Sequence, residues 1–263
     1  MRLGICTGLD HLVEAYEAGY AYAETQLAYT IGVADVQEYA QMRQMIEASP
    51  IPVEVFNCLL PGEIKVVGPD ADLAAADAYL QTALPRAAEV GADMVVFGSG
   101  GSRALPDGFP VEHAWEQLAD AARLAGDIAG RCGLTIVMEP LCGCRYLNRV
   151  DIGAEFVDRL NHPQVKLLAD LFHMAKVHEP FDHLSLAGNC LAHIHVATPA
   201  IPEVGEGEAF DFTGFFTALA VAGYDGRVSV EDNPWLLPKQ QPPWTTVFRA
   251  MREYVESCRP VRS

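Results

Sequence analysis

The chain has 263 residues, half of them hydrophobic, so it is long enough to bury a full core and has a size at which (β/α) barrels form one domain. Its 35 acidic residues outnumber the 18 basic ones and give a formal net charge of −17. The sequence contains no cluster of Lys and Arg. Because nucleic-acid binding relies on Lys and Arg that neutralise phosphates, this composition argues against a nucleic-acid partner.

Membrane insertion and export are also not indicated. No apolar run approaches the roughly 20 residues needed to cross a bilayer, and the start MRLGICTGLD lacks the apolar segment of a signal peptide. The seven cysteines are odd in number and lack the spacing of a disulfide framework, which predicts a reduced, cytoplasmic setting. Cys142 and Cys144 form a lone C-x-C without a second pair, which does not favour structural zinc.

Short β-rich runs alternate with longer helical stretches along the whole chain. In the first half, the pattern predicts strands at 2–6, 21–26, 53–57 and 94–99, and helices at 10–18, 34–47, 71–90 and 111–131. In the second half, it predicts strands at 135–139, 166–170, 192–197 and 227–231, and a helix near 150–160.

Several predicted helices end in glycine a few residues before the next strand, as in EVGADMVV and VAGYDGRVSV. The strands are nearly continuous apolar runs, which is typical of parallel strands covered on both faces. Eight βα units therefore predict a single α/β domain over 1–263, a closed (β/α)8 TIM barrel. A doubly wound open sheet is the alternative.

Ligand-type residues occur at the ends of four consecutive predicted strands. These residues are Glu139, Asp170, His195 and Glu231, at intervals of 31, 25 and 36 residues. Each interval is about one βα unit, and barrel enzymes carry their chemistry at the carboxyl ends of the strands. If the barrel closes, the four side chains converge above its axis.

Three carboxylates held at such short range beside one imidazole would repel one another unless a cation lay between them. We therefore predict one divalent metal ion held by these four residues. Oxygen ligands with one nitrogen favour Mn²⁺ or Mg²⁺, with Co²⁺ and Zn²⁺ as alternatives.

Two further histidines lie close to these positions in the sequence. His173 follows Asp170 by three residues and is expected just beyond the strand end, within reach of a substrate oxygen. His193 lies two residues before His195, on the same face of the strand but one layer deeper. We interpret His193 as a hydrogen-bonded core histidine that supports the site from beneath.

The pieces MVVFGSGGSRALPDGF, IVMEPL, LLADLFHM, AHIHVA and GYDGRVSVE occur in that order over residues 94–231. As an ordered set they resemble the xylose-isomerase-like TIM barrel superfamily, in particular its sugar phosphate isomerase/epimerase branch with the ketose 3-epimerases. The resemblance implies that the four strand-end residues bind the metal. It also implies that Glu139 and Glu231 exchange protons on opposite faces of a substrate carbon, and that His173 holds a substrate hydroxyl or carbonyl.

The chain departs from the epimerase pattern at two places. Ile201 stands where those enzymes carry an arginine six residues after the ligand histidine. The loop after EPL is the shorter LCGCRYLNRV, in which Arg145 takes the approximate place of a glutamate. The two departures favour a substrate that differs from a simple free ketose. Arg145, or Arg103 from the loop after the fourth strand, would contact an anionic or carbonyl group of it, and the alternative is that each is an ordinary loop arginine.

The leading functional hypothesis is a metal-dependent isomerase or epimerase of a sugar or sugar-like polyol, working through an enediolate. The alternative is a metal-dependent lyase or dehydratase of an inosose or 3-oxo-glycoside, and a sugar-binding barrel without catalysis is a further one. An apurinic endonuclease-like activity is disfavoured by the negative charge and by Asn57 at the end of the third strand. The expected partner is a small-molecule sugar, and a homo-oligomer is suggested by family analogy alone.

Overall fold

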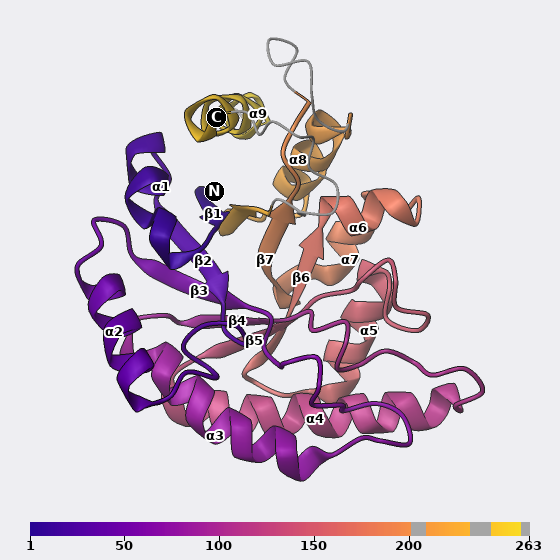
Figure 1. Cartoon of the computed structure of the whole chain (residues 1–263). Helices are drawn as coiled ribbons and strands as arrows, with labels where there is room; N and C mark the ends of the chain where they lie inside the picture. Colours follow the sequence, from indigo (N-terminus) through magenta and orange to yellow (C-terminus); the bar gives the residue numbers. More distant parts are fainter. Residues whose placement is uncertain (201–208, 232–242, 259–263) are drawn as a thin grey trace.

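The computed structural model describes residues 1–200, 209–231 and 243–258, and its strands form a closed parallel barrel (Figure 1). The strands follow one another in sequence order, and β1 closes the barrel by pairing with β8. They are β1 Arg2–Cys6, β2 Tyr22–Gln26, β3 Val53–Asn57, β4 Met94–Phe97, β5 Thr135–Met138, β6 Val165–Asp170, β7 Leu191–Val196 and β8 Arg227–Val230. The predicted single-domain TIM barrel is confirmed, and the open-sheet alternative is wrong.

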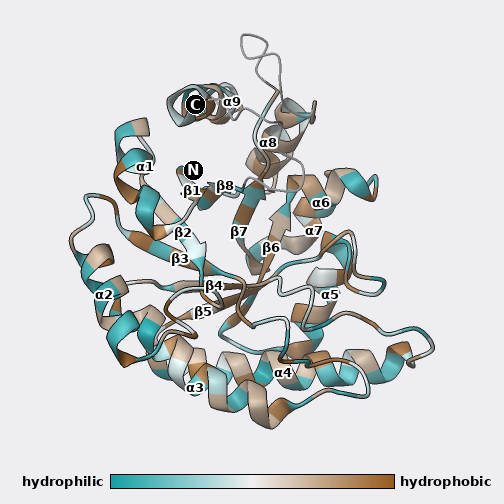
Figure 2. Cartoon of the chain, viewed as in Figure 1, coloured by the Kyte–Doolittle hydropathy of each residue, from teal (hydrophilic) through white to brown (hydrophobic). Residues whose placement is uncertain are grey.

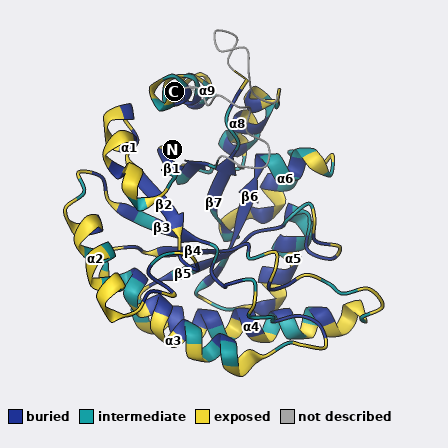
Figure 3. Cartoon of the chain, viewed as in Figure 1, coloured by how far each residue is buried: buried dark blue, intermediate teal, exposed yellow. Residues whose placement is uncertain are grey.

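The helices lie outside the strands, with their apolar faces turned toward the barrel and their exposed faces turned outward (Figures 2 and 3). They are α1 Leu12–Ala18, α2 Val36–Glu47, α3 Leu73–Glu89, α4 Val111–Cys132, α5 Val150–Leu160, α6 Leu171–Lys176, α7 His183–Ala187, α8 Phe212–Val221 and α9 Trp244–Ser257, with short 3-10 turns at Leu9–His11 and Gly188–Cys190. The first five begin and end close to the predicted bounds. The sequence pattern did not predict where α6, α7, α8 and α9 begin and end.

The barrel interior is apolar in its lower part and polar above. A layer of buried side chains fills the interior beneath the site: Tyr22, Val55, Met94, Val96, Val137 and Leu168. The Tyr22 ring lies so close to Gly4 that a Cβ there would overlap it, so β1 needs a glycine at this level. The packed layer gives the polar residues above it a rigid floor.

Ion pairs close the opposite end of the barrel. Glu54 on β3 accepts from Arg2 (Nη2–Oε1 2.7 Å) and from Arg227 (Nε–Oε2 2.7 Å). Arg227 also pairs with Asp93, at 2.7 Å between Nη2 and Oδ2. These contacts join the starts of β1 and β8 to β3 and to the residue before β4, so they hold the barrel ends in register.

Among the described residues, no helix combines the length and the apolar character needed to cross a bilayer. All seven cysteines are free thiols.

Candidate metal centre

Four consecutive strands bring Glu139, Asp170, His195 and Glu231 to one place at the carboxyl end of the barrel. One ligand atom from each residue lies within 4.8 Å of those of the other three. Glu139 and Glu231 directly follow β5 and β8, whereas Asp170 ends β6 and is paired in register with His195 on β7. The structure thus brings together the four residues predicted to bind the metal.

The site is enclosed on three sides and more open at Glu231. The side chains of His195, Asp170 and Glu139 are 0%, 4% and 8% exposed, whereas that of Glu231 is 32% exposed. His195 Nδ1 lies 3.0 Å from Glu231 Oε2 and 3.5 Å from Glu139 Oε1. Asn57 at the end of β3 donates from Nδ2 to Glu231 Oε1 at 3.3 Å and so restrains that carboxylate.

The charges of the cluster perturb one another strongly. Burial, together with the negative charges of Glu139 and Glu231, raises the pKa of Asp170 to about 6. Burial favours neutral forms at Glu139 and His195 as well. However, the attraction of His195 lowers the pKa of Glu139. The carboxylates of Glu24 and Glu231 raise the pKa of His195 well above its usual value. A cation between these side chains would relieve the repulsion among the carboxylates.

The donor set fits a divalent cation. It offers oxygens from three carboxylates and one imidazole nitrogen, the mixture that Mn²⁺, Mg²⁺, Co²⁺ and Zn²⁺ accept. His195 Nδ1 is buried, and in the described part of the chain it has no partner with hydrogen-bond geometry, although carboxylates lie close to it. Because carboxylate oxygens lie beside this nitrogen, a metal ion bound there would supply its missing partner.

His173 lies at the edge of the cluster, where it was predicted. Its Nε2 is 3.5 Å from Asp170 Oδ2 and 3.9 Å from Glu139 Oε1. Burial favours the neutral ring, but Asp170 and Glu139 outweigh burial and raise the pKa of His173 to about 9. Nδ1 lies 3.3 Å from the backbone amide nitrogen of Cys142 and 3.2 Å from its Sγ. These contacts hold the ring so that Nε2 is directed at the cluster.

The two arginines of the surrounding loops differ in their environment. Arg145 is more than half exposed, pairs with Asp107 at 3.0 Å between Nη1 and Oδ1, and donates from Nη2 to the carbonyl of Leu105 at 2.6 Å. Arg103 is fully buried and donates to the backbone carbonyls of Gly98 and Glu139. Arg103 therefore holds the backbone that carries Glu139.

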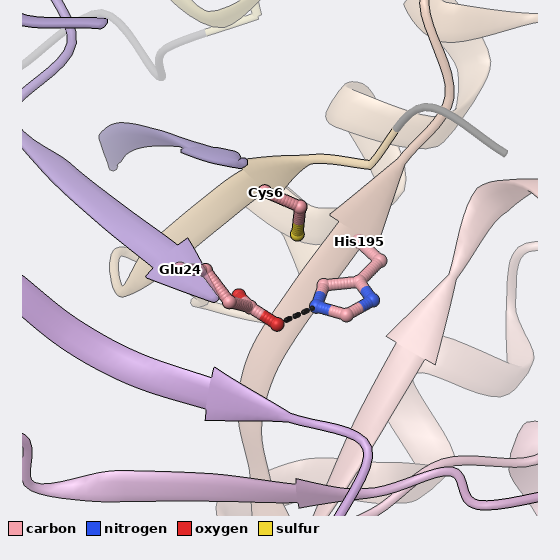
Figure 4. A group of neighbouring side chains, drawn as sticks. All are labelled: Cys6, Glu24 and His195. Carbon is pink, nitrogen blue, oxygen red and sulfur yellow. Dashed lines mark hydrogen bonds and ion pairs between the residues drawn. The ribbon is translucent and has the colours of Figure 1, made fainter. Parts of the chain in front are cut away.

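Glu24 is the site residue that sequence reasoning missed. It is fully buried on β2, and one of its carboxylate oxygens contacts His195 (Figure 4). The other oxygen contacts His193. The only signal in the sequence was an acidic residue inside the apolar run AYAETQ. His193 is buried and hydrogen-bonded, as predicted. Ile201 lies outside the described residues.

The protein is a TIM barrel with a candidate metal centre. The barrel has eight parallel strands, and carboxylates and one histidine lie together at the ends of β5 to β8. Residues 12–255 match the model of the family described as xylose isomerase-like TIM barrel, and the chain belongs to this family.

The similarity to individual proteins is partial. Over 120 residues the chain is 28% identical to the D-psicose 3-epimerase of Ruminiclostridium cellulolyticum, which covers 44% of this chain and 41% of that protein. Over 128 residues it is 27% identical to the 3-dehydroshikimate dehydratase of Pseudomonas putida, which covers 43% of this chain and 20% of that protein. The chain thus spans less than half the length of these curated relatives.

A solved structure of D-allulose 3-epimerase from Methylomonas sp. superposes with a TM-score of 0.80 at 18% identity, over 98% of both chains. At 18% sequence identity, this similarity supports a shared fold and nothing more specific.

Proposed function

We propose that the protein is a divalent-metal-dependent isomerase or epimerase that acts on a sugar or sugar-like polyol by proton transfer through an enediolate. The observation that carries the proposal is the cluster of Glu139, Asp170, His195 and Glu231, with ligand atoms within 4.8 Å of one another. The partial similarity to a ketose 3-epimerase supports the same reading.

The four clustered residues would hold one divalent cation, with Mn²⁺ or Mg²⁺ favoured over Co²⁺ and Zn²⁺. Such a cation supplies Lewis-acid stabilisation of the negative charge that develops on the substrate oxygens. The chain itself would shield the reacting carbon from water, since three of the four side chains are buried and only Glu231 is substantially exposed.

Glu139 and Glu231 are the proposed proton-transfer pair. They follow β5 and β8, so they approach the cluster from different sides of the barrel mouth. One carboxylate would remove the proton next to the substrate carbonyl, and the other would return a proton to the opposite face. Arg103 holds the backbone of Glu139, and Asn57 restrains the carboxylate of Glu231.

His173 and Arg145 are the proposed substrate contacts. The Nε2 atom of His173 faces the cluster and could donate to a substrate hydroxyl or carbonyl. Arg145 would bind a carbonyl or anionic group by exchanging its exposed partner Asp107 for the substrate.

The seven free thiols suit a cytoplasmic site of action.

The test is hydrogen exchange. The Mn²⁺-loaded protein is incubated in D₂O with a panel of ketoses, inososes and 3-oxo-sugars, and NMR follows both deuterium next to the carbonyl and the appearance of isomers. We expect exchange on at least one compound and a loss of at least about 100-fold in Glu139→Gln and in Glu231→Gln. Glu155→Gln, on the exposed side of α5, is the matched control. Wild-type exchange rates in both cluster variants would refute the proposal, as would a metal-loaded protein that labels no compound and forms no isomer.

The partial similarity to a dehydratase favours one second candidate, a lyase that acts on an inosose or a 3-oxo-glycoside. It would begin with the same proton removal and then expel water or an alcohol. Release of water or of the aglycone without isomer formation, followed by NMR on the same panel, would favour the lyase over the epimerase.

A further inference from the structure

A buried carboxylate links two histidines inside the barrel. Glu24 projects from β2 across the interior to β7, where its Oε1 lies 2.9 Å from His195 Nε2 (Figure 4). Its Oε2 lies 2.9 Å from His193 Nε2. Ser229 on β8 donates from Oγ to Glu24 Oε2 at 2.7 Å, and its Oγ is 3.0 Å from the hydroxyl of Tyr22. All five side chains belong to buried residues.

The direction of each hydrogen bond follows from the carboxylate. An ionised carboxylate only accepts, so both histidine Nε2 atoms and the Ser229 hydroxyl must donate to Glu24. The Ser229 oxygen then accepts from Tyr22. The pattern is self-consistent at His193: its Nδ1 is buried without a hydrogen-bond partner among the described residues, so a proton there would be a buried donor without an acceptor.

The same reasoning fixes His195. With its proton on Nε2, the lone pair of the neutral ring is on Nδ1, the atom that faces Glu231 and Glu139 at 3.0 and 3.5 Å. We propose that Glu24 is a positioning residue that sets the tautomer and the ring orientation of His195, so that Nδ1 is presented to the cation. This inference rests on the proposed metal site.

A competing arrangement lies on the other side of the same ring. Cys6 is paired in register with Glu24, and one atom each of Cys6, Glu24 and His195 lies within 4.8 Å of the others. A cation there would have to replace the hydrogen bond between Glu24 Oε1 and His195 Nε2. The hydrogen-bonded geometry therefore places the cation on the Nδ1 side and leaves Nε2 to Glu24.

The decisive variant is Glu24→Gln, which keeps the size of the side chain but replaces one acceptor oxygen with an amide donor. Mn²⁺ affinity is measured by calorimetry and by electron paramagnetic resonance, without substrate. Because loss of the partner of a metal-bound histidine costs about 10–100-fold in metal affinity, we expect Mn²⁺ binding weakened by that factor. Glu54→Gln is the matched control, since it removes a carboxylate at the opposite end of the barrel, and its Mn²⁺ affinity should equal that of the wild type.

The tautomer is read directly by ¹⁵N NMR of histidine-labelled protein, which separates a positioning role from a purely structural one. In the wild type loaded with Mg²⁺ or Zn²⁺, His195 should keep its proton on Nε2 and show an unprotonated, metal-bound Nδ1, and His193 should also carry its proton on Nε2. A metal-loaded His195 that has lost its Nε2 proton and keeps a proton on Nδ1, which would mark binding on the Cys6 side, would overturn the proposal. This measurement remains decisive if Glu24→Gln does not fold.

The failure of this inference can be told from failure of the proposed function. If the wild type binds none of the divalent cations, the metal site itself is refuted. If the wild type binds Mn²⁺ and Glu24→Gln binds it within about threefold as tightly, only the role of Glu24 is refuted.

Discussion

The carboxylate of Glu139 lies directly against the backbone of Gly98, so that a Cβ atom at position 98 would overlap Glu139 Oε2. Arg103 donates to the backbone carbonyls of both residues from a fully buried position. The ends of β4 and β5 are thereby locked together beneath the candidate metal centre. The position of Glu139 thus depends on two residues, Gly98 and Arg103, that lie outside the cluster of candidate metal ligands.

Gly98→Ala should displace the Glu139 carboxylate and weaken Mn²⁺ binding, because a methyl group would occupy the space of Oε2. We expect about a tenfold loss of affinity, as for other changes that disturb the support of a metal ligand. Gly62→Ala is the matched control, because a Cβ at Gly62 meets no atom within 4 Å. Equal Mn²⁺ affinities for both variants in calorimetric titrations would contradict this prediction.

Arg103→Met should destabilise the fold, since it leaves two buried carbonyls without their donor. A loss of about 3 kcal/mol in the free energy of unfolding is expected from the cost of unsatisfied buried groups. Arg145→Met removes an exposed pair with Asp107 and should cost less than about 1 kcal/mol. Urea denaturation of the two variants gives the comparison, and similar losses would show that Arg103 does not hold these loops.

Divalent cations should stabilise the wild type. At a hundredfold excess of Mn²⁺ over its dissociation constant, binding adds about 2.7 kcal/mol, which corresponds to a rise in Tm of about 5–10 °C for a chain of this size. Addition of a chelator should reverse the rise.

Asp170→Asn should show a much smaller rise in Tm on addition of Mn²⁺. Its metal-free form should nevertheless be at least as stable as the wild type, because ionised Asp170 is repelled by Glu139 and Glu231. A Tm unaffected by Mn²⁺, Mg²⁺, Co²⁺ and Zn²⁺ would refute the metal site.

The ion pairs at the opposite end of the barrel should make stability depend on pH. Burial favours the neutral form of Glu54, but Arg2 and Arg227 outweigh it and hold its pKa below the usual value. The ionised group is thus favoured in the folded state, and its contribution is fully present above the ordinary carboxyl pKa and lost as the pH falls through the lower folded-state pKa. Glu54→Gln should cost about 1–2 kcal/mol at neutral pH.

That difference between wild type and Glu54→Gln should shrink as the pH falls from about 6 to about 3. Unfolding free energies of both proteins, measured across this range, provide the check. A difference that grows on acidification would mean that the pKa of Glu54 is raised rather than lowered.

Local pattern was sufficient to predict the barrel and the four clustered residues. Near-continuous apolar runs separated by helical segments identify strands and helices from neighbouring residues alone. The carboxyl end of each strand is then known without further information, so Glu139, Asp170 and Glu231 could be placed at one end of the barrel once eight parallel strands were counted. The assignment of these residues to a metal remains a prediction.

Which atoms of distant strands meet depends on the tertiary structure. Glu24 and His195 lie on β2 and β7, which are not neighbours in the sheet, and they are 171 residues apart in sequence. No periodicity within either strand encodes their contact, because it arises only when β1 pairs with β8 and the interior closes. In the same way, the close contact between Gly98 and the Glu139 carboxylate follows from the approach of the two segments that follow β4 and β5. The sequence was enough to predict the barrel and the types of residue at its mouth. Barrel closure set which nitrogen of His195 faces Glu139 and Glu231 and which faces Glu24.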